Sequence, residues 1–414
     1  MSTYDDASLV FYPSGYKASK AYSLKPTDGS GDLNFTRAST ATRVNESGLI
    51  EEVAANVPRL DNSQGGCSTL LLEPQRTNLY LRSQEFDNAV WLGSTGFTIT
   101  ANNATSPDGT VNAEKMTPTV ATTAKQTYQQ LSVVNGSKYS VSVFVKTNGY
   151  DFFAIDFSTA FSGFGGNVVI FDVVNGTVSS NAASLTASIE NYGNGWFRCS
   201  ASDFATNTGS SRVYLKTQQA NNTANYAGDG VSGQYWWGAQ AELGSYPTSY
   251  IPTTTTAVTR VADSCFKENI SSVLPSAYPF TLYAQGFLRE NLDILIGINN
   301  ISDTSTYYNI GATDNGFSAR ARYGSETSVS TSIGRSIGTH KVAAVFTSSE
   351  IRLFANGVLI ATGANATTFS ESANDVILGQ LRISADVGKR SSINEALVFP
   401  TALSDADLIA LTTL

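Results

Sequence analysis

The chain has 414 residues, of which 41% are hydrophobic, 11% aromatic and only 14% charged, and its formal net charge is −8. Ordinary soluble domains carry about 25% charged residues, so the polar surface here comes from Ser, Thr, Asn and Gly, which favours turn-rich all-β folds over helical bundles. No basic cluster of the kind that nucleic-acid binding needs is visible, and no run approaches the roughly 18 apolar residues of a membrane span. We therefore expect neither nucleic acid as a partner nor insertion into a membrane.

The N-terminus and the cysteines bear on where the protein is made. Residues 1–6 contain no basic region and no apolar stretch, so no secretory signal is visible. Cys67, Cys199 and Cys265 lie far apart and lack metal-ligand spacing. An odd number of distant cysteines predicts free, mostly buried thiols in a reducing compartment.

Residues 1–84 show little regular pattern apart from strand-like pieces such as the apolar block at 70–72. Their position and irregularity predict a small β-rich module that docks the protein to its neighbours. Arg37, Arg59 and Arg76 are expected to pair with carboxylates or carbonyls inside this module rather than to bind a ligand.

Residues 85–252 are dense in short strand patterns. Residues 139–146 alternate between apolar and polar over most of their length, as a half-buried strand does. The run 168–178 reads as a hairpin in which Asn175 and Gly176 supply the positive φ angles of a type I′ turn. Short strands at intervals of roughly 8 to 20 residues, with no helix between them, predict a β-sandwich.

Two prolines mark the end of this region. Pro247 and Pro252 fix φ and remove two backbone donors, so the last strand cannot continue through them. The β-branched run 253–256 then favours an extended backbone. We expect a linker at 253–261 before the next domain.

Residues 262–414 carry a second set of strand patterns. The run 351–361 reads as a hairpin, again with an Asn-Gly pair, Asn356 and Gly357, at a type I′ turn. Near the end of the chain, Ser404 precedes acidic residues and an apolar pattern, which predicts the N-cap of a short helix.

Several short sequence motifs resemble motifs of known phage proteins. The blocks 35–42 and 71–79 resemble an N-terminal module that often precedes jelly rolls in phage structural proteins. The words Asn-Gly-Trp-Phe-Arg-Cys at 194–199 and Trp-Gly-Ala-Gln at 237–240 resemble the carbohydrate-binding-module-like jelly rolls of phage appendages. Residues 262–414 resemble the laminin-G or concanavalin-like lectin sandwich.

These resemblances imply a bacteriophage virion structural protein, a fibre or surface appendage that binds host glycans. The implied fold is all-β, with tandem antiparallel β-sandwiches (jelly rolls) at 85–252 and 262–414 after a small irregular β-rich N-terminal module at 1–84. The implied location is the virion, assembled in the bacterial host cytoplasm and exposed on the particle exterior. Other virion proteins are expected as partners through the N-terminal module, and a homotrimer is favoured by analogy with fibres. The alternative is a purely structural capsid or tail decoration or adaptor protein without sugar binding.

Residues suited to catalysis are sparse, and the protein is not expected to be an enzyme. His340, the one histidine, is expected at a strand edge rather than as a general base. No nucleophile elbow, metal-ligand cluster or phosphate-cradling loop is visible. Glu51 and Glu52 face opposite sides of a strand and cannot act together on one sugar. Carboxylates distant in sequence could converge, so a polysaccharide depolymerase stays as the third reading.

Sugar binding has better candidates, because carbohydrate sites pair an aromatic platform with amide and carboxylate side chains that bond hydroxyls. Trp236 and Trp237 face opposite sides of one strand. The resemblance makes Trp237 the core residue and leaves Trp236 as the candidate platform; alternatively, Trp236 packs under a loop or at a subunit contact. The other candidate glycan-binding residues lie on the loop before this strand: Asn221, Asn222, Asn225, Tyr226 and Asp229.

The resemblance also suggests a structural calcium ion, which jelly-roll carbohydrate modules often carry. Asp229 and Glu242 are the candidate oxygen ligands, although the chain lacks a dense Asp-X-Asp pattern. No cofactor is expected to be required.

Overall fold

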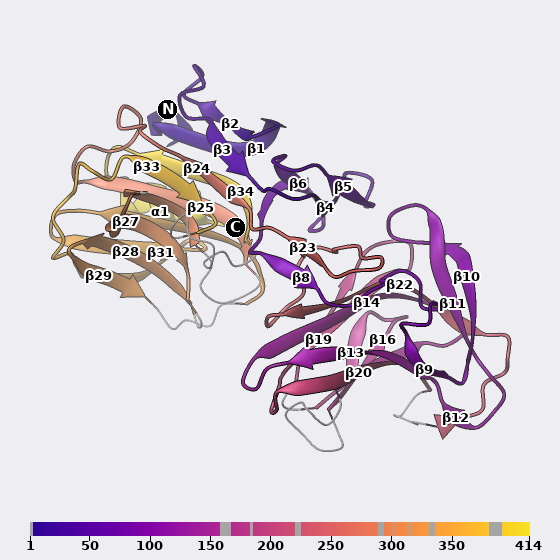
Figure 1. Ribbon diagram of the computed structural model, residues 1–414. Helices are drawn as coiled ribbons and strands as arrows, with labels where there is room; N and C mark the ends of the chain where they lie inside the picture. The colour runs from indigo at the N-terminus through magenta and orange to yellow at the C-terminus, as the bar shows by residue number, and fades with distance from the viewer. Residues whose placement is uncertain are drawn as a thin grey trace. The chain divides into compact units, whose positions relative to one another are not determined.

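The computed structural model is all-β and forms two compact units (Figure 1). It describes residues 3–157, 167–182, 185–219, 225–288, 294–300, 302–313, 316–330, 336–380 and 391–414. Unit 1 consists of Met1–Glu46, Glu52–Gln75 and Val261–Leu414, and unit 2 of Ser47–Glu51 and Arg76–Arg260. Over the described residues, no helix combines the length and the hydropathy that a membrane crossing requires.

Unit 1 is built on one antiparallel sheet of 16 strands. From edge to edge its strands are β29 (Ser325–Ser330), β28 (Phe317–Tyr323), β27 (Asp303–Ala312), β26 (Ile294–Asn300), β33 (Asp375–Leu378), β24 (Ser264–Lys267), β3 (Leu33–Thr36), β2 (Lys20–Lys25), β1 (Leu9–Lys17), β34 (Ser391–Phe399), β25 (Phe280–Leu288), β30 (Gly338–Phe346), β31 (Glu350–Ala355) and β32 (Val358–Ala364). Two further strands, β6 (Arg59–Asp61) and β7 (Thr69–Leu72), join it through β34.

This sheet folds over on itself, so that β28 faces β31, β27 faces β30 and β26 faces β34. The core between the two halves is apolar and aromatic. Phe280 stacks on Phe346 at 4.9 Å between ring centroids, and Tyr308 meets Phe280 edge-on at 5.3 Å. On the opposite face of β25, β30 and β34, the helix α1 (Asp405–Thr412) buries Leu408 in a second apolar cluster. The unit is therefore a sandwich with a helical cover.

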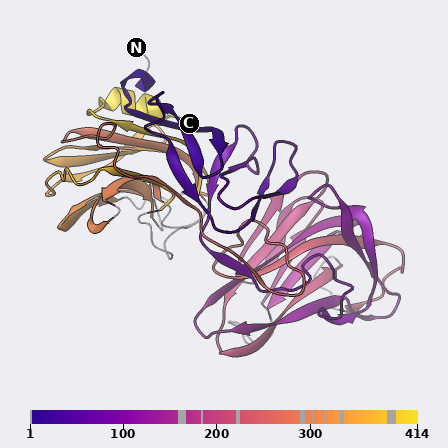
Figure 2. The same ribbon diagram turned by 45° about the horizontal axis from the view of Figure 1, so that its top comes forward.

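The N-terminal residues belong to this sheet. β1 pairs with β34, with Leu9 opposite Val398, and β3 pairs with β24, with Phe35 opposite Cys265. Figure 2 shows the indigo N-terminal strands beside the yellow C-terminal part of the same unit. The sequence led us to expect a separate module at 1–84, whereas the structure completes one sheet from both ends of the chain, because β1 and β3 pair with the free edges of β34 and β24.

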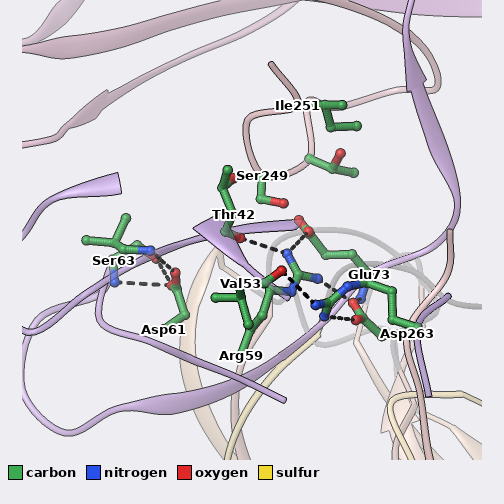
Figure 3. A network of polar contacts seen from close by, with 12 residues as sticks. Thr42, Val53, Arg59, Asp61, Ser63, Glu73, Ser249, Ile251 and Asp263 are labelled. Carbon is green, nitrogen blue, oxygen red and sulfur yellow. Dashed lines mark hydrogen bonds and ion pairs between the residues drawn. The ribbon is translucent and has the colours of Figure 1, made fainter. Parts of the chain in front are cut away.

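A buried charge network joins the three segments of unit 1 (Figure 3). The carboxylate of Asp263 accepts from Arg37 Nη1 at 3.1 Å, from Arg59 Nη2 and from the backbone N–H of Glu73 at 2.8 Å. Arg59 Nη1 also donates to the Glu73 carboxylate at 2.8 Å, and all four side chains are fully buried. Attraction to Asp263 and Glu73 outweighs the effect of burial and raises the pKa of Arg59. The predicted pairing inside residues 1–84 is confirmed for Arg59 with Glu73 and for Arg37 with carbonyl oxygens such as that of Ala54 at 2.7 Å, but the second carboxylate, Asp263, lies outside that range.

Unit 2 is a sandwich of two six-stranded antiparallel sheets. The first, named the β22 sheet, has the order β10 (Phe97–Thr105), β11 (Val111–Pro118), β22 (Gly233–Leu243), β14 (Lys138–Asn148), β19 (Phe197–Phe204) and β18 (Thr186–Asn191). The second, named the β20 sheet, has the order β17 (Thr177–Asn181), β16 (Val168–Asp172), β15 (Phe152–Phe157), β20 (Gly209–Gln218), β13 (Gln126–Val133) and β9 (Leu92–Thr95). The core between them includes Val141, Val143 and Val145 of β14, as the predicted alternation at 139–146 requires.

The remaining elements are short. They are the 3-10 helix η1 (Thr3–Asp6) and the strands β4 (Ala41–Val44), β5 (Ile50–Val53), β8 (Arg76–Asn78), β12 (Thr123–Ala124), β21 (Asn225–Tyr226) and β23 (Val258–Arg260). β8 pairs with β23, so the two ends of the long segment of unit 2 lie side by side in an antiparallel ladder. The expected linker at 253–261 thus contains a strand of unit 2.

The segment that contains the two prolines after β22 is not a free linker. The segment 244–252 returns over the outer face of the β22 sheet. Its Thr248 carbonyl accepts from Arg198 Nη1 at 2.8 Å, and its Tyr250 ring packs on Trp237 at 4.6 Å. Much of this face is therefore covered by the protein's own chain.

Candidate functional site

The structure places Trp236 in the core of unit 2. Its side chain is 0% exposed and its ring meets Phe153 edge-on at 5.2 Å, while its Nε1 donates to Gln234 Oε1 at 3.0 Å. Trp237 lies on the other face of β22 and is covered by Phe144 and Tyr250. The expectation that Trp236 is an exposed platform is therefore wrong, because Trp236 and not Trp237 fills the space between the sheets.

The loop residues predicted to bind hydroxyls are only partly available. Asn221 and Asn222 lie outside the described residues. Asn225 is exposed, whereas Tyr226 is 4% exposed and its hydroxyl lies 2.6 Å from Thr217 Oγ1. Burial raises the pKa of Tyr226, as for a core phenol.

Asp229 and Glu242 do not form one calcium site. Asp229 precedes the start of β22 and Glu242 lies near its end, so a strand rise of about 3.3 Å per residue separates them by roughly 30 Å. The Asp229 carboxylate accepts from the N–H groups of Val231 and Ser232, and the buried Glu242 carboxylate accepts from Thr248 N and Oγ1. Each carboxylate therefore shapes its own turn. In the part of the chain that the structure describes, no three His, Cys, Asp or Glu side chains cluster as a metal site would require.

His340 has a structural environment. Its Nε2 lies 2.9 Å from the carbonyl oxygen of Ser336, and its Nδ1 lies 2.9 Å from Asn356 Nδ2. Both ring nitrogens are thus engaged beside the β31–β32 turn, as the predicted strand-edge role implies.

The outer face of the β22 sheet carries a hollow of about 90 Å³. It is lined by Gly48, Leu49, Thr105, Ser106, Pro107, Lys146, Tyr192, Asn194 and Trp196. The hairpin tip after β10 forms one wall, where Thr105 accepts at its carbonyl oxygen from Trp196 Nε1 at 3.1 Å. Pockets that enclose small ligands measure about 300 Å³ or more, so this hollow suits one substituent of a larger ligand that lies on the surface.

A row of three side chains leads across the sheet toward this hollow. Lys115 of β11, Tyr235 of β22 and Lys146 of β14 are direct cross-strand neighbours. Their immediate neighbours in the chain, Met116 and Trp236 among them, fill the core, so the three point to the outer face. All three are half-buried. Cross-strand neighbours have Cβ atoms about 5 Å apart, which places the Tyr235 side chain between the stems of two lysines.

Glycines beside this row direct the two lysine stems. A Cβ at Gly195 would lie 3.4 Å from Lys146 Cε, and one at Gly233 would lie 3.3 Å from Lys115 Cε. Each stem therefore lies along a stretch of backbone that has no side chain, Lys146 toward the hollow and Lys115 toward the start of β22. We name Lys115, Tyr235, Lys146, Tyr192 and Asn194 the Tyr235 surface.

The outer face of the β20 sheet also carries aromatic side chains, but cationic side chains of the protein itself lie over their rings. Tyr128 and Tyr214 are cross-strand neighbours and meet edge-on at 5.0 Å. Arg212 lies over the Tyr128 ring at 4.9 Å and Lys216 over the Tyr214 ring at 5.3 Å. The protein's own cations thus cover one side of each ring.

Sequence reasoning did not find the Tyr235 surface. Lys146 was visible as the polar end of an alternating strand, and Tyr235 as the neighbour of two tryptophans. Their proximity depends on the register of β11, β22 and β14, which are distant in sequence. The sequence signal that could have found it is the set of polar-face positions in the alternating patterns of these three strands, compared with one another.

No family model and no curated protein matches the chain. Among solved structures, the chain is similar to the CBM40 of the Ruminococcus gnavus IT-sialidase, with 22% identity over 35% of this chain and 91% of that chain and a TM-score of 0.30. It is also similar to a leech intramolecular trans-sialidase, with 22% identity over 34% of this chain and 24% of that chain and a TM-score of 0.29. The receptor binding domain of botulinum neurotoxin C/D mosaic serotype aligns with 13% identity over 36% of this chain and 40% of that chain, with a TM-score of 0.29. These alignments assign the chain to no family.

Proposed function

We propose that this protein binds glycans and that unit 2 holds the site, on the Tyr235 surface. The observation that carries the proposal is the register that sets Tyr235 between two lysines and beside a shallow hollow on an outer sheet face. An aromatic ring on a flat sheet face can stack on the apolar face of a sugar ring. The ammonium groups and the Asn194 amide supply hydrogen-bonding partners for sugar substituents.

The composition of the hollow favours binding without catalysis. Its nine lining residues include no Asp, Glu, His or Cys, so they offer neither the carboxylate pair of a glycosidase nor a nucleophile with its base. The nearby Asp108 is committed to the hairpin tip: burial is outweighed by hydrogen bonds from Ser106, Thr110 and Asn112, which lower the pKa of Asp108. An ionised carboxylate of this kind is unsuited to act as a general acid.

The sequence resemblance extends the proposal to a biological setting. We place the protein on the outside of a bacteriophage virion, as a fibre or surface appendage that attaches to host glycans, with unit 1 contacting other virion proteins and a trimer as the assembled form. Immunogold electron microscopy of particles tests the location, and sedimentation of the purified protein tests the trimer. Absence of the protein from purified particles would contradict this placement without affecting sugar binding.

The binding proposal is tested with purified full-length protein on a glycan array, with Tyr235→Ala as the variant. Tyr214→Ala is the matched control, since Tyr214 is also a half-buried tyrosine on an outer sheet face of unit 2. We expect specific binding that is lost in Tyr235→Ala and kept in Tyr214→Ala. A folded protein that binds no glycan would refute the proposal and favour the purely structural decoration or adaptor role.

A further inference from the structure

The charges around the Tyr235 surface differ from those of the protein as a whole. The chain is acidic, with a net charge of −8, yet two lysines flank Tyr235. Among the residues that the structure describes, neither Lys115 nor Lys146 has a carboxylate within 4 Å. The surface is therefore a local region of unneutralised positive charge.

Three acidic residues of the adjoining loops are engaged with those loops, among them Asp151, whose carboxylate accepts from Thr147 Oγ1 at 2.8 Å. The Asp229 carboxylate accepts two backbone N–H groups at 2.9 and 2.8 Å, and the Asp108 carboxylate accepts from Thr110 N at 2.8 Å and from Asn112 Nδ2 at 3.2 Å. These contacts hold the carboxylates in their own turns. Among the described residues, none of these carboxylates forms an ion pair with Lys115 or Lys146.

The lysines keep donors for a ligand. Lys115 Nζ donates to the carbonyl oxygen of Val231 at 2.9 Å, which leaves two of its three N–H groups. Lys146 reaches the hollow with its stem against Gly195 and is the one charged residue among the nine that line it. A ligand that covers Lys146 removes water from an ammonium group, which costs free energy unless a negative charge replaces that water.

We propose that the Tyr235 surface selects glycans that carry negative charge, as carboxylate or sulfate groups, with the acidic group of one sugar bound by Lys146 at the hollow and an adjacent sugar stacked on Tyr235. Lys115, on the far side of the ring, meets a second acidic group along the same chain. The inference rests on the proposed function and narrows its ligand class. Charge-assisted hydrogen bonds are about twice as strong as neutral ones, so the anionic groups and not the hydroxyls set the preference.

The test compares three probes by isothermal titration on the full-length protein: a hexamer of galacturonic acid, its fully methyl-esterified form and a sulfated chondroitin hexasaccharide. The ester keeps the sugar and its length but removes the charge. Lys146→Met removes the ammonium and keeps an unbranched stem. Lys138→Met is the matched control, because Lys138 lies on the same strand and the same face at its other end.

We expect the acidic hexamer to bind at least tenfold more tightly than its ester, and its affinity to fall with added salt. We expect Lys146→Met to weaken binding of the acidic probe by about tenfold or more and binding of the ester by a smaller factor, with Lys138→Met like the parent. Preference between the carboxylated and sulfated probes identifies the acidic group.

If the acidic hexamer and its ester bound equally and Lys146→Met bound like the parent, the inference about charge would be overturned. Loss of binding in Tyr235→Ala would in that case still support the proposed site. Equal losses in Lys146→Met and Lys138→Met would likewise overturn it, because they would show diffuse attraction. A protein with native near-ultraviolet circular dichroism that binds none of the probes and nothing on the glycan array would refute the proposed function itself.

Discussion

Asp263→Ala is expected to destabilise unit 1 severely. The change removes the carboxylate that accepts from Arg37 Nη1, Arg59 Nη2 and the Glu73 N–H, although Arg37 Nη1 keeps the Val57 carbonyl oxygen at 3.2 Å. It leaves two buried guanidinium groups with one carboxylate between them. Removing one partner of a buried ion pair costs about 3–5 kcal/mol, which is a large share of the roughly 5–15 kcal/mol that holds a domain folded.

The tryptophans make this loss measurable in one unit at a time. All four, Trp91, Trp196, Trp236 and Trp237, lie in unit 2. Tryptophan emission during urea unfolding therefore follows unit 2, whereas far-ultraviolet circular dichroism follows both units. With an m-value of about 2–3 kcal/mol/M, the expected loss lowers the midpoint of the unit 1 transition by roughly 1–2.5 M, and the emission midpoint is unchanged.

Arg352→Met is the control for a charge contact in the same unit. Arg352 pairs with Asp405 and Glu350 at partly exposed positions, and exposed pairs contribute up to about 1 kcal/mol. If Asp263→Ala cost no more than this control, the network would not have the structural weight assigned to it. A matching shift in tryptophan emission would show that the two units do not unfold separately.

Three further changes test other features. Burial, and to a smaller extent the neighbouring Asp87, raises the pKa of Glu114 to about 8, above an unfolded value of about 4.3. As the pH rises between these two values, the unfolding free energy of unit 2 should therefore fall by about 1.4 kcal/mol per pH unit. Glu114→Gln should flatten that slope, as measured by urea titrations at several pH values. Trp236→Ala should cost unit 2 about 3–5 kcal/mol by emission-monitored unfolding, whereas an unchanged midpoint would show that the ring is not core. Ser404→Ala removes the acceptor of Asp407 N at 3.2 Å and should cost about 1 kcal/mol by circular dichroism.

Local features of the fold could be predicted because their cause is local. The turn at Asn356 and Gly357 has φ of 49° and 81°, as a type I′ turn requires, and Ser404 caps α1 through its side chain. The predicted hairpin at 168–178 is confirmed, but the predicted type I′ turn at Asn175 and Gly176 is wrong. Four residues connect β16 to β17, and of Asn175 and Gly176 only Gly176 has positive φ. The Asp172 carboxylate accepts from Asn175 N at 2.9 Å, which stabilises the wider turn.

Features set by distant pairings could not be predicted. β1 meets β34 across most of the chain, and no local pattern in residues 9–11 specifies that partner. For the same reason, alternation showed that Trp236 and Trp237 face opposite sides but not which side becomes the interior. The candidate site depends on the register of three strands and appears only once that register is known.

The antiparallel pairing of β8 with β23 sets an order for biosynthesis. Everything that unit 2 requires from the long segment has been translated by residue 260, and its two ends can pair once they have left the ribosome. β1 must instead wait for β34 at 391–399, and until then its edge is open to aggregation. A chain cut short after residue 260 would retain the surface proposed to bind sugar and lose the unit into which the N-terminal strands fold. Completion of unit 1 thus requires translation through β34.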